Sequence, residues 1–304
     1  MRGFENMLKK AAADREFSEA KPRVSEFRRF IRVMSGRWVV VFGSIVILIL
    51  IVVAAFAPRI APYYPDKIDL PNRLLQPNSE HLLGTDSLGR DTLSRIIYGG
   101  RVALLIGVVA TGTAAFIGMT LGLIAGYFGS ITYAIIMRLV DALMSFPVIV
   151  ISLVLATMLG GGLINIMVAI GIGLSSTYAR VMCGTVLSVQ ENEYVLAARA
   201  SGAGDLRIMM RHIFMNSFPP IIVLITMNIG AAILIGAALT YLGVGIEPPN
   251  AAWGAMVNDG YMYLLTHPTL GLAPGIAIML VVFSFNMVGD GLRDALDPRL
   301  RGTL

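Results

Sequence analysis

Residues 193–215 read EYVLAARASGAGDLRIMMRHIFM and form a polar, Ala-rich island between two long apolar runs. The residues from Glu193 to Ala200 are nearly all strong helix formers, and Gly202 and Gly204 then break the pattern. Asp205 is placed to cap a second short helix, whose apolar residues recur at helical spacing. Arginine and aspartate side chains, of which the stretch holds four, each cost about 2.5–3.5 kcal/mol at the centre of a bilayer. We therefore expect two short helices in water or against another protein, between segments that cross a membrane.

The composition indicates an integral membrane protein. Of the 304 residues, 56% are hydrophobic and only 14% are charged, and the mean hydropathy is +0.74. Soluble domains carry about 25% charged residues. The formal charge of +5 collects in segments predicted to face the cytoplasm, so we expect no nucleic-acid partner. Because Cys183 is the only cysteine, no internal disulfide can form.

Six apolar segments are long enough to cross a bilayer, so the sequence predicts an all-α, polytopic membrane helix bundle with six transmembrane helices. The predicted spans are 38–57, 102–126, 133–159, 163–181, 218–242 and 270–287. In the second span, small residues recur at every fourth position, a pattern that allows close helix packing. These residues are Ala110, Ala114, Gly118, Gly122 and Gly126. In the third span, Arg138 and Asp141 are predicted to pair on one helical face, and Pro147 is expected to kink the helix or to mark where it enters lipid.

The distribution of positive charge sets the predicted orientation. With both termini inside, 18 of the 24 Lys and Arg residues fall in cytoplasmic segments, in line with the positive-inside rule. Residues 1–37 form a basic cytoplasmic tail, in which apolar residues at helical spacing indicate either an interfacial helix or a disordered tail that only fixes the orientation. The segments 58–101 and 243–268 are then external, and 190–216 is a cytoplasmic loop.

The 193–215 stretch resembles the EAA coupling loop of ABC-importer permeases. Ala197, Ala198 and Gly202 match that pattern, whereas Leu196 stands at the usual Glu position and Phe214-Met215 replace the usual Leu-Pro end. The alternative is an ordinary cytoplasmic loop, since Ala-rich helices are common. The resemblance implies a loop that docks on an ATPase through six residues, namely Glu193, Ala197, Ala198, Arg199, Gly202 and Asp205.

A second and more specific resemblance precedes the second span. Residues 81–101, HLLGTDSLGRDTLSRIIYGGR, are similar to the corresponding segment of dipeptide/oligopeptide permeases, in particular of the C partner of the pair. The matching residues are Gly84, Thr85, Asp86, Gly89, Arg90 and Asp91. The alternative is a purely structural turn, in which Asp91 and Thr92 cap the following helix. The segments 240–254 and 285–298 also resemble this family, with Glu247 where Gln is usual.

The resemblance implies a type I ABC-importer permease fold, with a core over 102–304 that follows a first span and external loop over 38–101. It implies a heterodimer with a second permease, two ATP-binding subunits at the cytoplasmic loop, and an external substrate-binding protein. The chain is then no enzyme and holds no cofactor or metal, because its partners bind ATP and Mg²⁺. The implied location is the plasma membrane of a bacterium or archaeon. The implied cargo is a di- or oligopeptide, or alternatively a nickel chelate, glutathione or an antimicrobial peptide.

The sequence contains no recognisable nucleotide-binding, catalytic or coupling-ion site of its own. None of its four lysines follows a glycine as a P-loop requires, and no HExxH or GxSxG pattern occurs. Apart from Arg138 and Asp141, charged residues lie at span ends or in loops, so a stand-alone secondary transporter or an intramembrane enzyme is less favoured. Within the spans, Asn228 and Thr226 are candidates for the translocation pathway, although a helix–helix hydrogen bond explains an intramembrane amide equally well.

Overall fold

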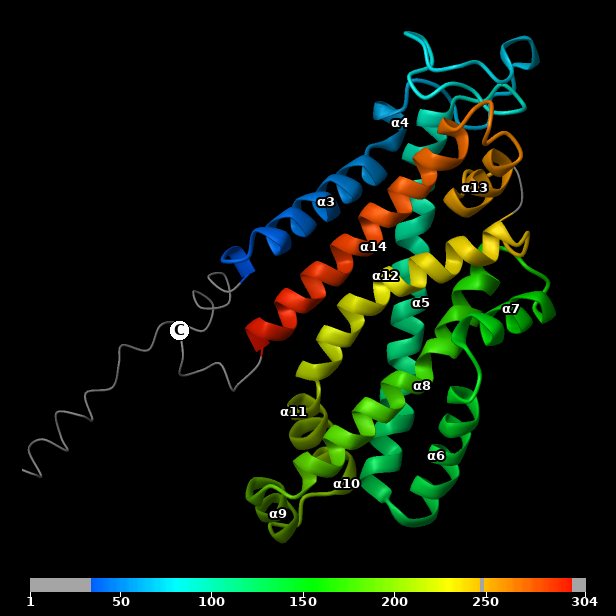
Figure 1. Ribbon diagram of the computed structural model, residues 1–304. Helices are drawn as coiled ribbons and strands as arrows, with labels where there is room; N and C mark the ends of the chain where they lie inside the picture. The colour runs from blue at the N-terminus through cyan, green and yellow to red at the C-terminus, as the bar shows by residue number, and fades with distance from the viewer. Residues whose placement is uncertain (1–33, 247–248, 297–304) are drawn as a thin grey trace, which may run out of the picture.

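The computed structural model describes residues 34–246 and 249–296, and over these residues it is helical with no β-strand (Figure 1). Residues 1–33 of the tail predicted over 1–37, Glu247, and the end of the C-terminal motif lie outside the described residues. The helices are α3 (Trp38–Ala55), α4 (Ala57–Ile60), η1 (Leu70–Asn72), α5 (Thr92–Phe128), α6 (Ser130–Met144), α7 (Val148–Met158), α8 (Leu163–Gln190), α9 (Glu193–Ala200), α10 (Asp205–Arg207), η2 (Ile208–Phe214), α11 (Met215–Ser217), α12 (Pro219–Tyr241), α13 (Trp253–Tyr261) and α14 (Thr269–Leu296).

Five of the described helices are long and apolar enough to cross a membrane, namely α3, α5, α8, α12 and α14. A sixth span forms if α6 and α7 are taken together, although these two meet at an angle of 94°. The predicted third span is therefore two helices with a sharp break. The cause is Pro147, whose ring disfavours helical backbone at Phe146 and which is itself non-helical, with φ −58° and ψ 134°. The all-α membrane bundle predicted from the sequence is confirmed.

The contact between α5 and α8 forms the centre of the bundle. Ala114 of α5 is fully buried, and the glycines that follow it at four-residue intervals leave no room for side chains. A Cβ atom added at Gly122 would lie 2.8 Å from Cβ of Met182, and one added at Gly126 would lie 2.7 Å from Cγ1 of Val186. The predicted strip of small residues thus sets the distance between the helices. Because the two surfaces interlock this closely, we expect α5 and α8 to move as one unit.

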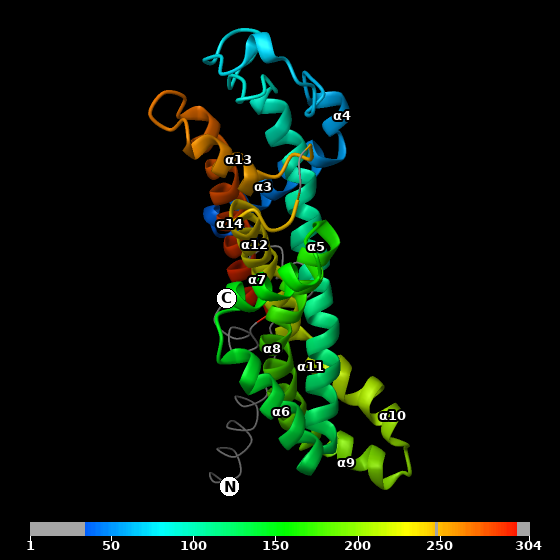
Figure 2. The same ribbon diagram turned by 90° about the vertical axis from the view of Figure 1, so that its right-hand side faces the viewer.

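α5 is the longest helix and joins the two ends of the molecule. Its 37 residues span about 55 Å at 1.5 Å per residue, against roughly 30 Å for the hydrocarbon core of a bilayer. The segment before it lies with α13 at one end of the bundle, and the region from α9 to η2 lies at the other (Figures 1 and 2). The helix begins at Thr92, before the predicted start at residue 102, because Asp91 caps its first turn.

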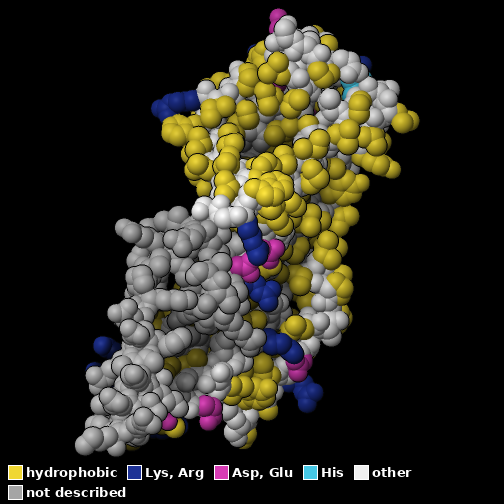
Figure 3. Space-filling model, turned by 60° about the vertical axis from the view of Figure 1, so that its left-hand side comes forward, with side chains coloured by type: hydrophobic (Ala, Val, Ile, Leu, Met, Phe, Trp, Pro, Cys, Tyr) yellow, Lys and Arg dark blue, Asp and Glu magenta, His cyan; other side chains and the backbone are white. Residues whose placement is uncertain are grey.

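The surface shows a large apolar region. In the view of Figure 3, hydrophobic side chains cover the upper part of the molecule, and most charged side chains lie lower down. α3 adds to the exposed apolar surface, with Leu48 61% exposed and Ile49 55% exposed. Exposed aliphatic side chains on a helix of spanning length are expected where that helix faces lipid.

Two predicted local contacts are wrong. Asp141 of α6 forms an ion pair with Arg180 of α8, which takes the place of the predicted pair with Arg138. Asp205 is the first residue of α10 and does not cap it, since its carboxylate accepts a hydrogen bond from Tyr127. In both cases a neighbour distant in sequence supplies the partner, and helical spacing alone cannot reveal such a neighbour.

Candidate functional sites

The 84–91 motif is a tight turn that depends on two glycines. Gly84 and Gly89 both have a φ of +75°, which residues with a side chain rarely adopt. A Cβ atom at Gly84 would collide with the carbonyl oxygen of Leu75, and one at Gly89 would collide with the carbonyl oxygen of Asp69. Backbone conformation and lack of space therefore both require glycine at these positions.

Two polar residues of the motif hold the neighbouring backbone. The hydroxyl of Thr85 donates to the carbonyl oxygen of Asn72 at 2.5 Å and accepts from the backbone N–H of Leu75 at 2.9 Å. The carboxylate of Asp91 accepts from the backbone N–H and the hydroxyl of Ser94, at 2.8 and 2.7 Å. These bonds satisfy the first turn of α5, so the helix cap predicted at Asp91 is confirmed.

A charge network ties the motif to α13. Nε of Arg90 donates to Oδ2 of Asp86 at 2.6 Å, and Nε of Arg95 lies 3.6 Å from the same oxygen. Nη2 of Arg90 also lies 3.9 Å from Oδ2 of Asp259 on α13. Arg90 and Arg95 are only 4% and 3% exposed, so their charges depend on these partners for compensation.

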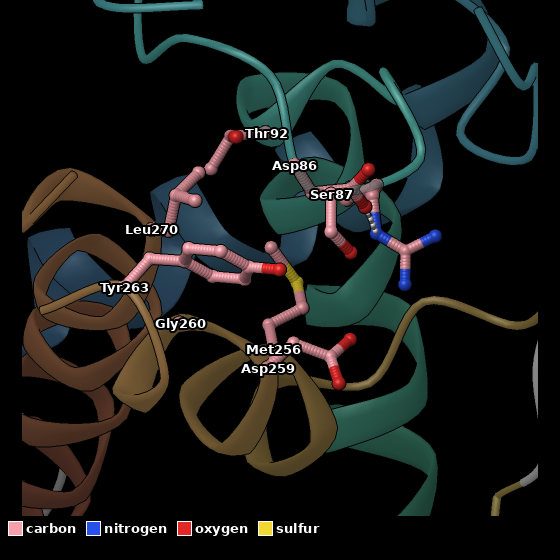
Figure 4. Close-up of a pocket in the computed structure, with 9 residues that line it drawn as sticks. Asp86, Ser87, Thr92, Met256, Asp259, Gly260, Tyr263 and Leu270 are labelled. Atoms are coloured by element: carbon pink, nitrogen blue, oxygen red, sulfur yellow. Dashed lines mark ion pairs between the residues drawn. The ribbon is translucent and has the colours of Figure 1, made fainter. Parts of the chain in front are cut away.

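The network borders a small, open pocket between the motif, α13 and the start of α14 (Figure 4). Asp259 and Tyr263 line it from the α13 side, and Asp86 and Arg95 line it from the side of the motif and α5. Burial raises the pKa of Asp259, while the charges of Arg90 and Arg95 oppose that rise. Beside the pocket, the contact between Arg90 and Asp259 joins α13, predicted only as part of an external loop, to the motif.

The 193–215 loop ends its first helix with a Schellman motif. The backbone N–H of Ala203 donates to the carbonyl of Ala198 at 3.1 Å, and that of Gly202 donates to the carbonyl of Arg199 at 3.0 Å. Gly202 has the positive φ that this motif favours, +79°, and an added Cβ atom would meet nothing within 4 Å. The bend lies where the glycines predicted it, and the space around Gly202 is open.

The loop is anchored on one side and open on the other. Val195, Ile208 and Ile213 are fully buried in the main hydrophobic cluster of the bundle. Leu196 and Leu206 point outward and are 51% and 74% exposed. Of the six predicted docking residues, Ala198 is half-buried and Glu193, Ala197, Arg199, Gly202 and Asp205 are exposed, but Arg199 and Asp205 also contact the bundle through Tyr127 of α5. An exposed surface of small residues with flanking leucines fits close contact with another protein.

Tyr127, near the end of α5, joins the loop to the bundle. Its hydroxyl donates to Oδ1 of Asp205 at 2.5 Å. The guanidinium carbon of Arg199 lies 5.9 Å from the centre of its ring, within cation–π range. The sequence prediction did not single out Tyr127. The sequence signal was limited to a phenol at the last turn of an otherwise apolar span, because Arg199 and Asp205 lie far from it along the chain.

Asn228 and Thr226 lie on α12 and are hydrogen-bonded within the protein. Nδ2 of Asn228 donates to the hydroxyl of Tyr178 at 3.2 Å, which joins α12 to α8. The hydroxyl of Thr226 donates to the carbonyl oxygen of Ile222, one turn earlier, at 3.0 Å. Of the two explanations for the amide, the structure shows the helix–helix hydrogen bond. A role in the pathway stays a prediction for both residues.

The structure thus gathers the predicted residues in two places. The six motif residues lie together at one end of α5, and the six loop residues lie at the other. The kink predicted at Pro147 is a full break between α6 and α7, and the π-helix η2, a rare geometry, was not predicted. The Ser-Phe-Pro run at 145–147 gave a signal for the break, whereas the sequence gave none for the π-helix.

Comparison with known proteins covers nearly the whole chain. Residues 118–302 match the family described as binding-protein-dependent transport system inner membrane component. Residues 25–77 match the N-terminal TM domain of oligopeptide transport permease C. Both matches agree with the resemblance drawn from the sequence motifs.

Curated relatives align over most of their own length. The chain is 40% identical to a dipeptide transport system permease protein, DppC, of Alkalihalophilus pseudofirmus, over 91% of each chain. It is 38% identical to a glutathione transport system permease protein, GsiD, of Pectobacterium atrosepticum, over 97% of each chain. It is 39% identical to the nickel transport system permease protein NikC of Escherichia coli K12, over 88% of this chain and 96% of the relative.

A solved structure supports the fold. A chain of the MetNI methionine ABC transporter in inward-facing conformations aligns with a TM-score of 0.54, covering 67% of this chain and 96% of that one. Because only 19% of the aligned residues are identical, the likeness concerns the fold alone.

Proposed function

We propose, from the premise that this chain belongs to the family of binding-protein-dependent transport system inner membrane components, that it is the permease subunit of an ATP-driven importer for di- and oligopeptides. One observation supports this proposal most directly. The 193–215 loop has an exposed surface of small residues, and it lies at the end of α5 opposite to the 84–91 motif. In this proposal the loop is the docking site of an ATP-binding subunit, and the other end receives a substrate-binding protein.

The proposed complex contains this chain, a second and homologous permease, two ATP-binding subunits and the external binding protein. The proposed orientation in the plasma membrane of a bacterium or archaeon places both termini and the 193–215 loop in the cytoplasm. ATP and Mg²⁺ bind to the partner subunits, and this chain performs no covalent chemistry. Nucleotide and substrate each favour a different arrangement of the bundle, so that hydrolysis drives it between inward-open and outward-open states.

The proposed pathway includes the break between α6 and α7. Non-helical backbone at membrane depth is tolerated where it is covered by protein or lines a water-filled cavity. Phe146 in this break is 59% exposed in the single chain, so a partner or the pathway covers it in the complex. Asn228 and Thr226 lie on the neighbouring α12 and complete the proposed pathway as polar groups within the bundle.

The substrate is proposed from the relatives. DppC is a dipeptide permease by name, which supports a peptide substrate for this chain. GsiD and NikC are named for glutathione and nickel, and their identities to this chain are nearly as high. Glutathione and nickel chelates are therefore the alternative cargo of the same machinery, together with antimicrobial peptides. The ligand held by the co-purified binding protein decides among them.

The proposal is tested by Gly202→Asp in the assembled complex. The new carboxylate projects into the open space beside the bend, where the ATP-binding subunit is proposed to dock. We expect the complex to assemble, uptake of labelled alanyl-alanine into proteoliposomes to be abolished, and substrate-stimulated ATP hydrolysis to be lost. Unchanged uptake in this variant would show that the loop is not the coupling element.

Gly202→Ala is the matched control. It introduces the same backbone strain at a positive φ, about 1–2 kcal/mol, with the least added bulk. We expect this variant to keep most of the uptake. If both variants lose uptake equally, backbone strain rather than obstruction of the docking surface is the cause.

A further inference from the structure

Tyr127 is the point at which the 193–215 loop meets α5 through polar contacts. Its hydroxyl donates to Asp205 at 2.5 Å, and its ring faces the guanidinium of Arg199 at 5.9 Å. Arg199 lies near the end of α9, and Asp205 is the first residue of α10. One side chain therefore contacts both helices that flank the bend at Gly202.

The rest of the loop is attached to the bundle through apolar contacts. Val195 and Ile208 are fully buried, but apolar contacts are non-directional and tolerate small shifts of one surface over another. The bond from Tyr127 to Asp205, by contrast, is a side-chain hydrogen bond that joins α10 to α5. A charge-assisted hydrogen bond is short and directional, so it fixes orientation as well as distance.

Tyr127 also belongs to the closely packed pair of helices α5 and α8. It directly follows Gly126, where the small-residue strip of α5 interlocks with Val186 of α8. A displacement of α10 that acts on the phenol therefore acts on α5 and α8 together. Through α5 it reaches Asp91 and the 84–91 motif, about 55 Å away along the helix.

We propose that Tyr127 is a positioning residue that transmits movement of the 193–215 loop to the α5–α8 unit, a role that rests on the function proposed above. The hydroxyl holds α10 through Asp205, and the ring holds the end of α9 through Arg199. Motion of the docked ATP-binding subunit then passes into the bundle rather than bending the loop alone. The residue touches neither nucleotide nor substrate, so its effect is on coupling.

The test uses Tyr127→Phe in the complete complex, reconstituted with the binding protein in proteoliposomes. This variant keeps the ring that faces Arg199 and removes the hydroxyl that donates to Asp205. We expect assembly and basal ATP hydrolysis to be unchanged, and uptake of labelled alanyl-alanine per ATP hydrolysed to fall about tenfold, the loss typical of one hydrogen bond to a charged group. Tyr133→Phe on α6 is the matched control, since it removes an exposed phenol near the same end of the bundle, and it should leave the ratio unchanged.

Two variants of Asp205 separate positioning from a general structural role. Asp205→Asn keeps a carbonyl oxygen that accepts from Tyr127 and should retain most of the coupling. Asp205→Ala should match Tyr127→Phe, and the double variant should be no worse than either single one, because both remove the same bond. Additive losses, or a Tyr127→Phe complex that fails to assemble, would overturn the positioning role.

The outcomes distinguish this inference from the proposed function. If Gly202→Asp abolishes uptake while Tyr127→Phe behaves as wild type, the loop couples and Tyr127 does not transmit its movement. If Gly202→Asp transports normally, the docking function itself fails, whatever Tyr127 does.

Discussion

The 84–91 motif and the 193–215 loop lie at opposite ends of α5 and differ in how closely the protein packs around them (Figure 1). In the motif, Thr85 and Arg90 are 0% and 4% exposed and bond to the protein itself. In the loop, Gly202 has open space where the motif glycines have none. A specific sequence pattern can thus encode internal structure at one place and a free surface at another.

The two regions therefore resemble the permease family for different reasons. The motif resembles the permease family because its turn tolerates few other residues, whether or not a partner binds there. The loop resembles the family mainly in small residues, which matter only if something docks against them. Substitutions in the motif should therefore lower the stability of the isolated chain, and substitutions on the open side of the loop should affect only the complex.

The largest loss of stability is expected for Gly89→Ala. The methyl group would strike the backbone of Asp69, and the positive φ would add strain, so we expect a loss of about 3–4 kcal/mol and poor accumulation in the membrane. Thermal unfolding of the purified chain in detergent measures this loss. Gly112→Ala on α5 is the control, because an added Cβ meets nothing there and the chain should melt no lower. Equal melting of Gly89→Ala and wild type would contradict a structural role for the motif.

A smaller loss, about 1–2 kcal/mol, is expected for Asp91→Ala, which removes the cap of α5. It also removes the partner of His81, whose Nδ1 lies 2.9 Å from the carboxylate. Asp91→Asn retains a capping oxygen and should recover most of the stability in the same melting experiment. If the two variants melt alike, the charge of Asp91 matters more than its cap, and the motif holds a charged site rather than a turn.

Some features of the fold were predictable from the sequence, and others were not. The bundle and the α5–α8 seam follow from local signals, because apolar length and the four-residue spacing from Ala110 to Gly126 are properties of one segment. The contacts of Asp141 and Asp205 were mispredicted because their partners, Arg180 and Tyr127, are far away in sequence.

The size of the break between α6 and α7 was underestimated for a different reason. A proline in an apolar run indicates a kink but not its size, and the 94° angle depends on how α7 packs against α8. The contact between Arg90 and Asp259 joins two segments that are separated along the chain by α5, α8 and α12. No periodicity of the sequence indicates such a contact.

A still smaller effect is expected at Asp259, at the edge of the motif network. Because burial raises its pKa, the folded protein binds the proton more tightly than the unfolded chain. The contribution of this carboxyl to stability is therefore present below its ordinary pKa of about 3.9 and is lost as pH rises through the folded pKa. Its side chain is 55% exposed, so solvent screening limits the effect to a few tenths of a kcal/mol.

Asp259→Asn tests the sign of that effect. The variant should melt at or slightly above wild type at pH 7, and the difference should vanish toward pH 4 in a series of melts. Arg90 keeps Asp86 as its partner in this variant, so no buried charge is left uncompensated. A clear loss at pH 7 would mean that the contact between Arg90 and Asp259 outweighs burial and that α13 depends on it.

The smallest effect on stability is expected for Ala197→Gln on the open side of α9. This variant is also the most direct test of the difference between the motif and the loop. Glutamine is a good helix former and the position is exposed, so the isolated chain should melt within about 0.5 kcal/mol of wild type. Its side chain would stand out from the small-residue surface, and co-purification with the ATP-binding subunits should be weakened. Ala197→Ser adds a single oxygen and should keep that association. Normal association of Ala197→Gln would place the docking surface elsewhere, and a lower melting temperature would show that the loop, like the motif, encodes internal structure.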